Sequence, residues 1–230
     1  MDSPFFPLPN GSAPQFTCTN ESLDAIMAGL EPKKGDTILA VGGSGDQAFA
    51  MLESDARVVV VDFEPEQIAF IEHRKEALSR GDYWTFARRA HIATDAQPDF
   101  GVRLVERDDY FKDSERLQRM HENLGNLTVL PPADVFEAVT RRAVVFSKVY
   151  LSNASTFNGI TIAVDIIASF VSALPLRTMV YFSDGGPIYL SGGDMVSLPS
   201  SFKLDEEHTL RARTLEQATL FYPSVYEKVA

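Results

Sequence analysis

The sequence has little cysteine, few histidines and no long apolar run. Its single cysteine, Cys18, cannot form an internal disulfide or a thiolate zinc site. A reactive thiol needs an activating neighbour, and no histidine lies near Cys18 in the sequence. The four histidines are not spaced as metal-ligating pairs. These absences argue against disulfide-stabilised, zinc-dependent and thiol-dependent proteins, and we expect no metal site.

Membrane-spanning and secretory features are also scarce. No stretch approaches the roughly 20 apolar residues that a membrane-spanning helix requires. Residues 1–9 lack the basic region of a secretory signal, so we expect a cytoplasmic protein without a transmembrane segment. The apolar residues of the N-terminal arm leave peripheral membrane contact open as an alternative to packing on the domain; they are Phe5, Phe6 and Leu8.

Basic residues are in the minority. The chain has 21 Lys and Arg against 32 Asp and Glu, which gives a net charge of −11. A negative field repels phosphate backbones, so we expect no nucleic-acid partner. The densest basic clusters, Arg88-Arg89 and Arg141-Arg142, are interpreted as solvated surface.

The 230 residues suffice for one α/β domain. Residues 1–16 are rich in Pro, Gly and Ser and predict an irregular arm, and residues 17–230 read as a single domain without repeat or linker. Short apolar runs alternate with helical patterns, which predicts a Rossmann-like, mostly parallel twisted sheet with helices on both faces and an antiparallel C-terminal edge. The expected strands are residues 37–41, 57–61, 127–130, 143–151 and 177–182. The expected helices are residues 22–30, 47–53, one opening at 64–66, 83–93, 113–124, one through 135–139, and 160–174, with an extended piece at 102–105 and an edge hairpin at 218–226.

The central motif is a glycine-rich loop after the first strand. Glycines lack Cβ atoms and let a turn pass close to a ligand, while the following helix presents free N–H groups. About twenty residues later Asp62 ends the second strand, where a carboxylate can accept from both ribose hydroxyls. Together they predict an adenosine ligand; the alternative is a glycine turn and a surface aspartate. The loop residues are Gly42, Gly43, Ser44, Gly45 and Asp46.

Two cofactor classes share this layout. Residues 43–48 formally match G-x-G-x-x-A, the dinucleotide motif, which keeps an NAD-binding oxidoreductase as an alternative. However, a helix and the turn at 32–36 precede the first strand, and no second nucleotide-binding half follows the fifth. In these respects the chain resembles class I methyltransferases that depend on S-adenosylmethionine (SAM). We therefore predict SAM as the cofactor.

Several segments also resemble a narrower family, the betaine-lipid 3-amino-3-carboxypropyltransferases and their bacterial relatives. They are Asn20–Ser22, the loop at 42–46, Val61–Gln67, Arg107–Phe111, Asn126–Val129 and Val149–Asn153. The resemblance covers about residues 17–184, with gaps. It implies a methyltransferase-like fold that transfers the aminocarboxypropyl arm of SAM, rather than its methyl group, to a small-molecule or lipid-like acceptor. The chain departs in two ways: it lacks much of the segment that the lipid enzymes insert, and Ala40 stands where ordinary SAM methyltransferases carry an acid against the methionine amino group.

The candidate catalytic residues follow the fourth and fifth strands. Asn153 faces the crevice in which α/β enzymes bind ligands, where it could hold the SAM amino acid or the substrate. Asp184 is a candidate base, and Tyr150 is either catalytic or an aromatic core residue. Asp134 is placed for the adenine amine or as the N-cap of the next helix. The predicted cofactor-binding set is Gly42, Gly43, Ser44, Gly45, Asp46, Asp62, Phe63, Gln67, Asp134, Val135, Ser152 and Asn153.

Three functional hypotheses therefore stand. The first is a SAM-dependent transferase, with aminocarboxypropyl and methyl transfer both open. The second is an NAD-binding oxidoreductase, and the third is a non-catalytic SAM-binding relative. The residues at the ends of the strands are where these hypotheses differ, so the geometry there bears on the choice.

Overall fold

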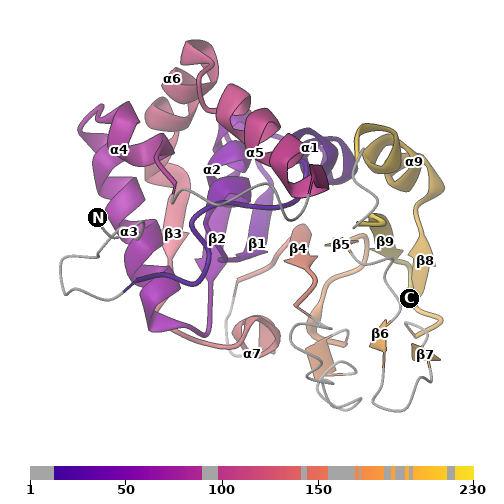
Figure 1. Cartoon of the computed structure of the whole chain (residues 1–230). Helices are drawn as coiled ribbons and strands as arrows, with labels where there is room; N and C mark the ends of the chain where they lie inside the picture. The colour runs from indigo at the N-terminus through magenta and orange to yellow at the C-terminus, as the bar shows by residue number, and fades with distance from the viewer. Residues whose placement is uncertain are drawn as a thin grey trace.

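A seven-stranded sheet forms the centre of the molecule, in the order β3-β2-β1-β4-β5-β9-β8 (Figure 1). The first five strands are parallel, β9 runs antiparallel to β5, and β8 runs antiparallel to β9. This order, with its antiparallel C-terminal edge, confirms the predicted Rossmann-like fold of the class I SAM-dependent methyltransferases. The strands are β1 (Thr37–Val41), β2 (Arg57–Val61), β3 (Leu127–Val129), β4 (Lys148–Ser152), β5 (Met179–Phe182), β8 (Phe202–Leu204) and β9 (Ser224–Lys228), with β6 (Ile188–Tyr189) and β7 (Met195–Val196) pairing separately.

The computed structural model describes residues 13–89, 98–140, 144–154, 169–170, 172–183, 188–189, 195–196, 199–216 and 221–230. No helix within these ranges is long and apolar enough to cross a membrane. The described helices are α1 (Leu23–Leu30), α2 (Asp46–Met51), α3 (Pro65–Ser79), α4 (Tyr83–Ala87), α5 (Pro98–Tyr110), α6 (Ser114–Glu122), α7 (Val135–Thr140) and α9 (Glu206–Leu215).

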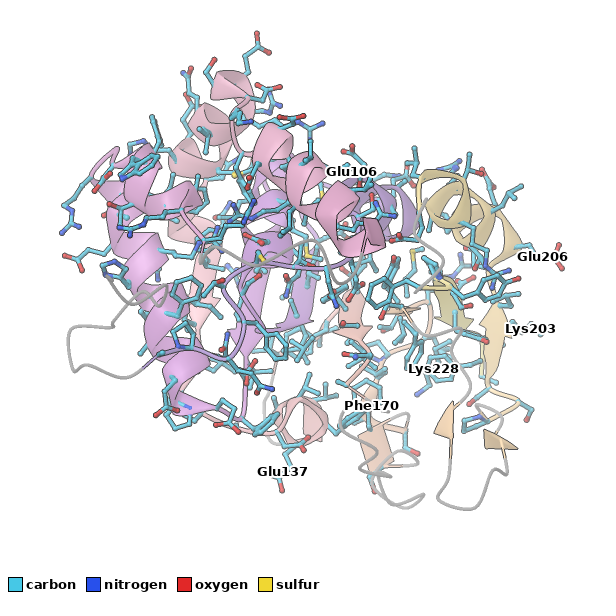
Figure 2. The ribbon with its side chains drawn as sticks, in the orientation of Figure 1. Glu106, Glu137, Phe170, Lys203, Glu206 and Lys228 are labelled. Carbon is cyan, nitrogen blue, oxygen red and sulfur yellow. The ribbon has the colours of Figure 1, made fainter. Side chains whose placement is uncertain are left out.

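Both faces of the sheet are covered, because alternate residues of each strand point to opposite sides. One face packs on α1, α2, α3, α6 and α9, and the other on α7, Phe170 and Leu174. Phe170 lies beside α7 (Figure 2), where its ring meets that of Phe136 edge-on at 5.1 Å. The strand residues on the first face include Ile38, Ala40, Val58, Val60, Tyr150 and Tyr181, and those on the second include Leu39, Val59, Val61, Val149, Leu151, Val180 and Phe182.

Helix starts follow the local sequence closely. Ser22 caps α1 by accepting from the backbone N–H of Ala25 at 3.3 Å. Pro65 occupies the first turn of α3, where its missing N–H costs nothing. The expected helices at 22–30 and from 64 onward are therefore confirmed, as is the strand–loop–helix unit between them.

The secondary structure predicted for two segments was wrong in type. Residues 102–105, expected to be extended, lie within α5, where Val102 and Val105 are 53% and 60% exposed. Their β-branched side chains suggested a strand, but Leu104 and Arg107 supply a buried helical stripe. The helix α9 was not expected at all, since it packs through the small side chains of Thr209 and Ala212 rather than an apolar stripe.

Other differences concern boundaries. The strand expected at 143–151 begins only at Lys148, and the helix expected at 83–93 ends at Ala87. In place of the edge hairpin expected at 218–226, β9 pairs antiparallel with β8, and α9 lies between these two strands along the chain. Most of the helix expected at 160–174 lies outside the described residues.

Candidate functional site

A cavity of about 450 Å³ opens where the strand order reverses, between β1 and β4. Ligands bind at such switch points in open α/β sheets, and this volume lies within the range of small-molecule sites. Most of the predicted binding residues line it: Gly43, Ser44, Asp62, Phe63, Gln67, Asp134, Val135, Ser152 and Asn153, together with Tyr150. The lining also includes residues that the sequence analysis did not select, among them Gln15, Phe16, Cys18, Thr19 and Glu21.

The glycine loop divides into a cavity side and a core side. Gly43, at φ 47°, lines the cavity, and a Cβ added there would meet only Gln47 Nε2 at 3.9 Å. Gly45, at φ 82°, does not line it, because an added Cβ would lie 3.0 Å from Cγ1 of Ile71. Gly42 is also absent from the lining and permits the close approach of Asp62. Gly42 and Gly45 therefore serve the packing beneath the loop, and their predicted contact with a ligand stays a prediction.

Asp62 lies at the carboxyl end of β2, as expected. Its Oδ2 accepts from the N–H of Gly43 at 2.7 Å and its Oδ1 from the N–H of Glu64 at 3.0 Å. Burial raises the pKa of the Asp62 carboxyl above its ordinary value, although these two hydrogen bonds act in the opposite direction. The carboxylate thus fixes the glycine loop and lines the cavity at the same time.

Asp46 was expected at the ligand, and the structure places it elsewhere. Its side chain is fully buried and is bound by Arg107 at 3.0 Å and by Arg74 at 2.8 Å. It also accepts from the backbone N–H of Thr19 at 2.8 Å. We call Asp46, Arg74 and Arg107 the Asp46 cluster. Ion pairing has drawn the carboxylate away from the cavity and into the core beneath the glycine loop.

The N-terminal segment forms part of the cavity wall. Gln67 donates to the backbone oxygens of Phe16 at 3.0 Å and Gly43 at 2.5 Å, and it accepts from the N–H of Phe16 at 2.9 Å. The predicted binding residue Gln67 therefore clamps the arm against the glycine loop. Residues 15 and 16, at the end of the expected arm, line the same cavity as residues 18 and 19.

Asp134 serves the helix that follows it. Its Oδ1 accepts from the N–H of Phe136 at 2.7 Å, in the first turn of α7. This confirms the capping interpretation. The side chain also lines the cavity beside Val135, so contact with an adenine amine stays a prediction.

A further carboxylate, Glu21, reaches the cavity beside β4. The hydroxyl of Tyr150 donates to its Oε1 at 2.8 Å, and the hydroxyl of Ser152 donates to the same oxygen. Burial, together with the charge of Glu21, raises the pKa of Tyr150 well above its usual value. Tyr150 therefore stays protonated at neutral pH and positions Glu21 instead of acting as a base. The only sequence signal for Glu21 was its place in the segment Asn20–Ser22.

Three more residues that the sequence analysis considered are Asn153, Asp184 and Cys18. Asn153 lines the cavity next to Ser152, at the predicted end of β4. Asp184 lies outside the described residues. Cys18 lines the cavity, but burial and the charge of Asp46 raise the pKa of its thiol to about 11, which keeps it protonated and unreactive.

No protein-family model matches the sequence, and no curated protein is similar to it. Solved structures of similar outline include the following three. MtNAS in complex with MTA and tNA is 10% identical, with a TM-score of 0.46 over 90% of this chain and 59% of its own. The cyclase SpnF is 9% identical, with a TM-score of 0.47 over 90% of this chain and 80% of its own. The rRNA methyltransferase aviRa from Streptomyces viridochromogenes is 14% identical, with a TM-score of 0.44 over 87% of this chain and 79% of its own.

The chain thus spans about three-fifths of the length of MtNAS. Its fold assignment rests on its own strand order.

Proposed function

We propose that the chain is a SAM-dependent transferase that moves the 3-amino-3-carboxypropyl group to a small-molecule or lipid-like acceptor. The observation that carries the proposal is the cavity at the switch point, in which the glycine loop, Asp62 and the end of β4 meet. The volume, the strand-end acid and the absent Cβ at Gly43 fit a nucleoside ligand with an extended arm.

In this proposal, different lining residues contact different parts of SAM. Asp62 would accept from the ribose hydroxyls, with Phe63, Asp134 and Val135 at the adenine end. Gly43 and Ser152 face the other part of the cavity. Bound SAM supplies a sulfonium, whose three attached carbons are open to nucleophilic attack.

The protein's own contribution to transfer is orientation and exclusion of water. Holding two reactants in line can supply several kcal/mol, about 7–11 kcal/mol in the best cases. Asn153, at the end of β4, is suited to orient an acceptor, while Phe16 and Val135 shield the cavity with apolar surface. The protonated Tyr150 takes no proton, so we expect an acceptor that arrives with a free lone pair.

Two features favour transfer of the aminocarboxypropyl arm over the methyl group. Ala40 supplies no carboxylate at the end of β1, and Leu151-Ser152-Asn153 resembles the lipid-forming transferases. A different hold on the arm changes which carbon of the sulfonium faces the acceptor. Conventional methyl transfer is the alternative within the same site.

Ligand binding is tested first. Isothermal calorimetry with SAM, S-adenosylhomocysteine (SAH), 5′-methylthioadenosine (MTA) and NAD on the full chain should show binding of the first three and not of NAD. Binding of NAD alone would favour the oxidoreductase, and binding of none would contradict the proposal.

Product analysis then identifies the transferred group. We expect mass spectrometry to find MTA after incubation of the protein with SAM and a cell extract, because departure of the arm leaves this nucleoside. Accumulation of SAH alone would establish methyl transfer instead. Formation of neither product, with SAM bound, would favour a non-catalytic SAM-binding protein. Heat-treated protein in the same extract controls for background turnover.

A further inference from the structure

Glu21 brings a buried carboxylate to the wall of the cavity. The residue is 3% exposed and lines the cavity beside Tyr150 and Ser152. Both of these residues donate hydroxyl hydrogen bonds to Oε1. Two hydroxyl donors therefore hold one oxygen of the Glu21 carboxyl at the cavity wall.

The backbone around Glu21 is held at three successive points. The N–H of Thr19 donates to Asp46 at 2.8 Å and that of Glu21 to Thr19 Oγ1 at 3.1 Å. The N–H of Ser22 donates to Glu216 at 3.1 Å. A carboxylate fixed in this way is ready for its partner before a ligand arrives.

The contact with β4 falls where the sheet is irregular. The β4–β5 register shifts between Tyr150 and Ser152, and Ser152 has φ 55°. A non-glycine residue in this region is strained and is retained where the surroundings require it. Here the bulge turns the Ser152 hydroxyl toward Glu21.

Tyr150 links Glu21 to the strand position that lacks an acid. Ala40 of β1 is the register partner of Tyr150 of β4, and the Tyr150 hydroxyl reaches Glu21 at 2.8 Å. The other cavity carboxylates among the described residues lie toward β2 and α7; they are Asp62, Glu64 and Asp134. The cavity therefore has one acidic end for a nucleoside and a separate carboxylate next to β4.

We propose that Glu21 binds the primary ammonium group of the SAM amino-acid arm and so replaces the acid missing at Ala40. This inference rests on the proposed function. A carboxyl group fixed at the cavity wall is suited to accept charge-assisted hydrogen bonds, and a primary ammonium is the cationic donor that the SAM amino-acid arm carries. Asn153, which is neutral, offers a weaker contact to the same group.

The test compares two ligands that differ in the amino-acid arm. SAH has the arm and its ammonium, whereas MTA has the same adenosine and sulfur without it. Calorimetry on Glu21→Gln should show SAH bound at least tenfold more weakly than by the wild type, with MTA within twofold. An SAH analogue with hydrogen in place of the amino group should lose affinity for the wild type and show no further loss on Glu21→Gln.

Glu64→Gln is the matched control, because Glu64 is another cavity carboxylate but lies next to Asp62. Any change that it causes should fall equally on SAH and MTA. Equal losses on Glu21→Gln, or an unchanged affinity for SAH, would overturn the inference and leave the ammonium-binding role to another residue or to the acceptor.

Two further measurements distinguish a failure of this inference from a failure of the variant to fold and from a failure of the proposed function. If Glu21→Gln does not fold, Tyr150→Phe, which removes one donor from Oε1, should weaken SAH severalfold without affecting MTA; no selective loss would overturn the inference. Failure of the wild-type protein to bind either ligand would reject the proposed function itself, which is a different result from unselective binding.

Discussion

Asp46 and Asp62 show how far a single residue can be interpreted from sequence. Both follow buried strands, and both were expected at the ligand. Arg74 and Arg107, which draw Asp46 into the core, lie far from it along the chain. Nothing in the local pattern distinguishes an aspartate with two distant arginines from one that faces a cavity. Glu21 was overlooked for the same reason, since its partners Tyr150 and Ser152 belong to β4.

Asp62→Ala tests the predicted ribose contact. Charge-assisted hydrogen bonds contribute about 1.5–3 kcal/mol each, so we expect SAH and MTA to bind at least tenfold more weakly. Both ligands carry the ribose, and calorimetry should show equal losses. A loss below threefold for either ligand would count against this role. Asp109→Ala, which alters an exposed aspartate paired with Lys112, controls for the loss of charge.

The thiol of Cys18 should be unreactive despite lining the cavity. With a pKa raised to about 11 by burial, only about one thiol in a thousand is ionised at pH 8. We expect a disulfide reagent such as 5,5′-dithiobis(2-nitrobenzoate) to label the folded protein at least about 100-fold more slowly than free cysteine. Labelling at the rate of the urea-unfolded chain would contradict this expectation.

At the scale of elements, prediction succeeded where the signal is local. Thr37–Val41 and Arg57–Val61 form strands with the expected bounds, because short apolar runs between turn residues leave few alternatives. The helix α9 was missed, since Ala212 packs on α1 close to Gly29 and no apolar stripe marks that contact. In α5, by contrast, the β-branched side chains of Val102 and Val105 predicted an extended segment where the structure has a helix. Tertiary packing, which the sequence pattern does not contain, decided these elements.

The two sides of the glycine loop should respond differently to an added methyl group. Alanine at positive φ is destabilising by more than about 1 kcal/mol, and Gly45→Ala also brings its Cβ to 3.0 Å from Ile71 and 3.2 Å from Phe49. Gly43→Ala meets nothing closer than 3.9 Å and carries the backbone cost alone. Urea unfolding should therefore find Gly45→Ala the less stable variant, whereas Gly43→Ala should be the one that weakens SAH. The reverse order would show that the loop faces the cavity differently.

At the scale of the whole molecule, the Asp46 cluster joins segments from the first half of the chain. It connects the N-terminal segment, α2, α3 and α5 through one buried carboxylate. Burial disfavours its charge, but Arg107 and Arg74 outweigh burial and hold the pKa of Asp46 far below its ordinary value. Because unfolded Asp takes up its proton near pH 3.9, this stabilisation is complete above about pH 5 and is lost as the pH falls toward the folded pKa.

Asp46→Asn should therefore lower the free energy of unfolding by about 3–5 kcal/mol at pH 7, because it removes the buried carboxylate from Arg74 and leaves Arg107 paired with the partly exposed Asp108. The wild type should lose melting temperature steeply below about pH 4, and the variant should lose less over the same interval. Asp109→Asn, which removes an exposed partner of Lys112, should stay within about 0.5 kcal/mol of the wild type. Equal stabilities of Asp46→Asn and Asp109→Asn would contradict the importance of the cluster.

The same cluster limits how the sequence of this protein can diverge. Arg74 donates at once to Asp46, to the carbonyl of Ser44 and to that of Phe86, in a cage of phenylalanine rings that a lysine could not fill in the same way. Losing one member of the cluster leaves buried charge, whereas exchanging all three for apolar residues does not. Homologues should therefore keep Asp46, Arg74 and Arg107 together or replace them together, so that the three positions co-vary.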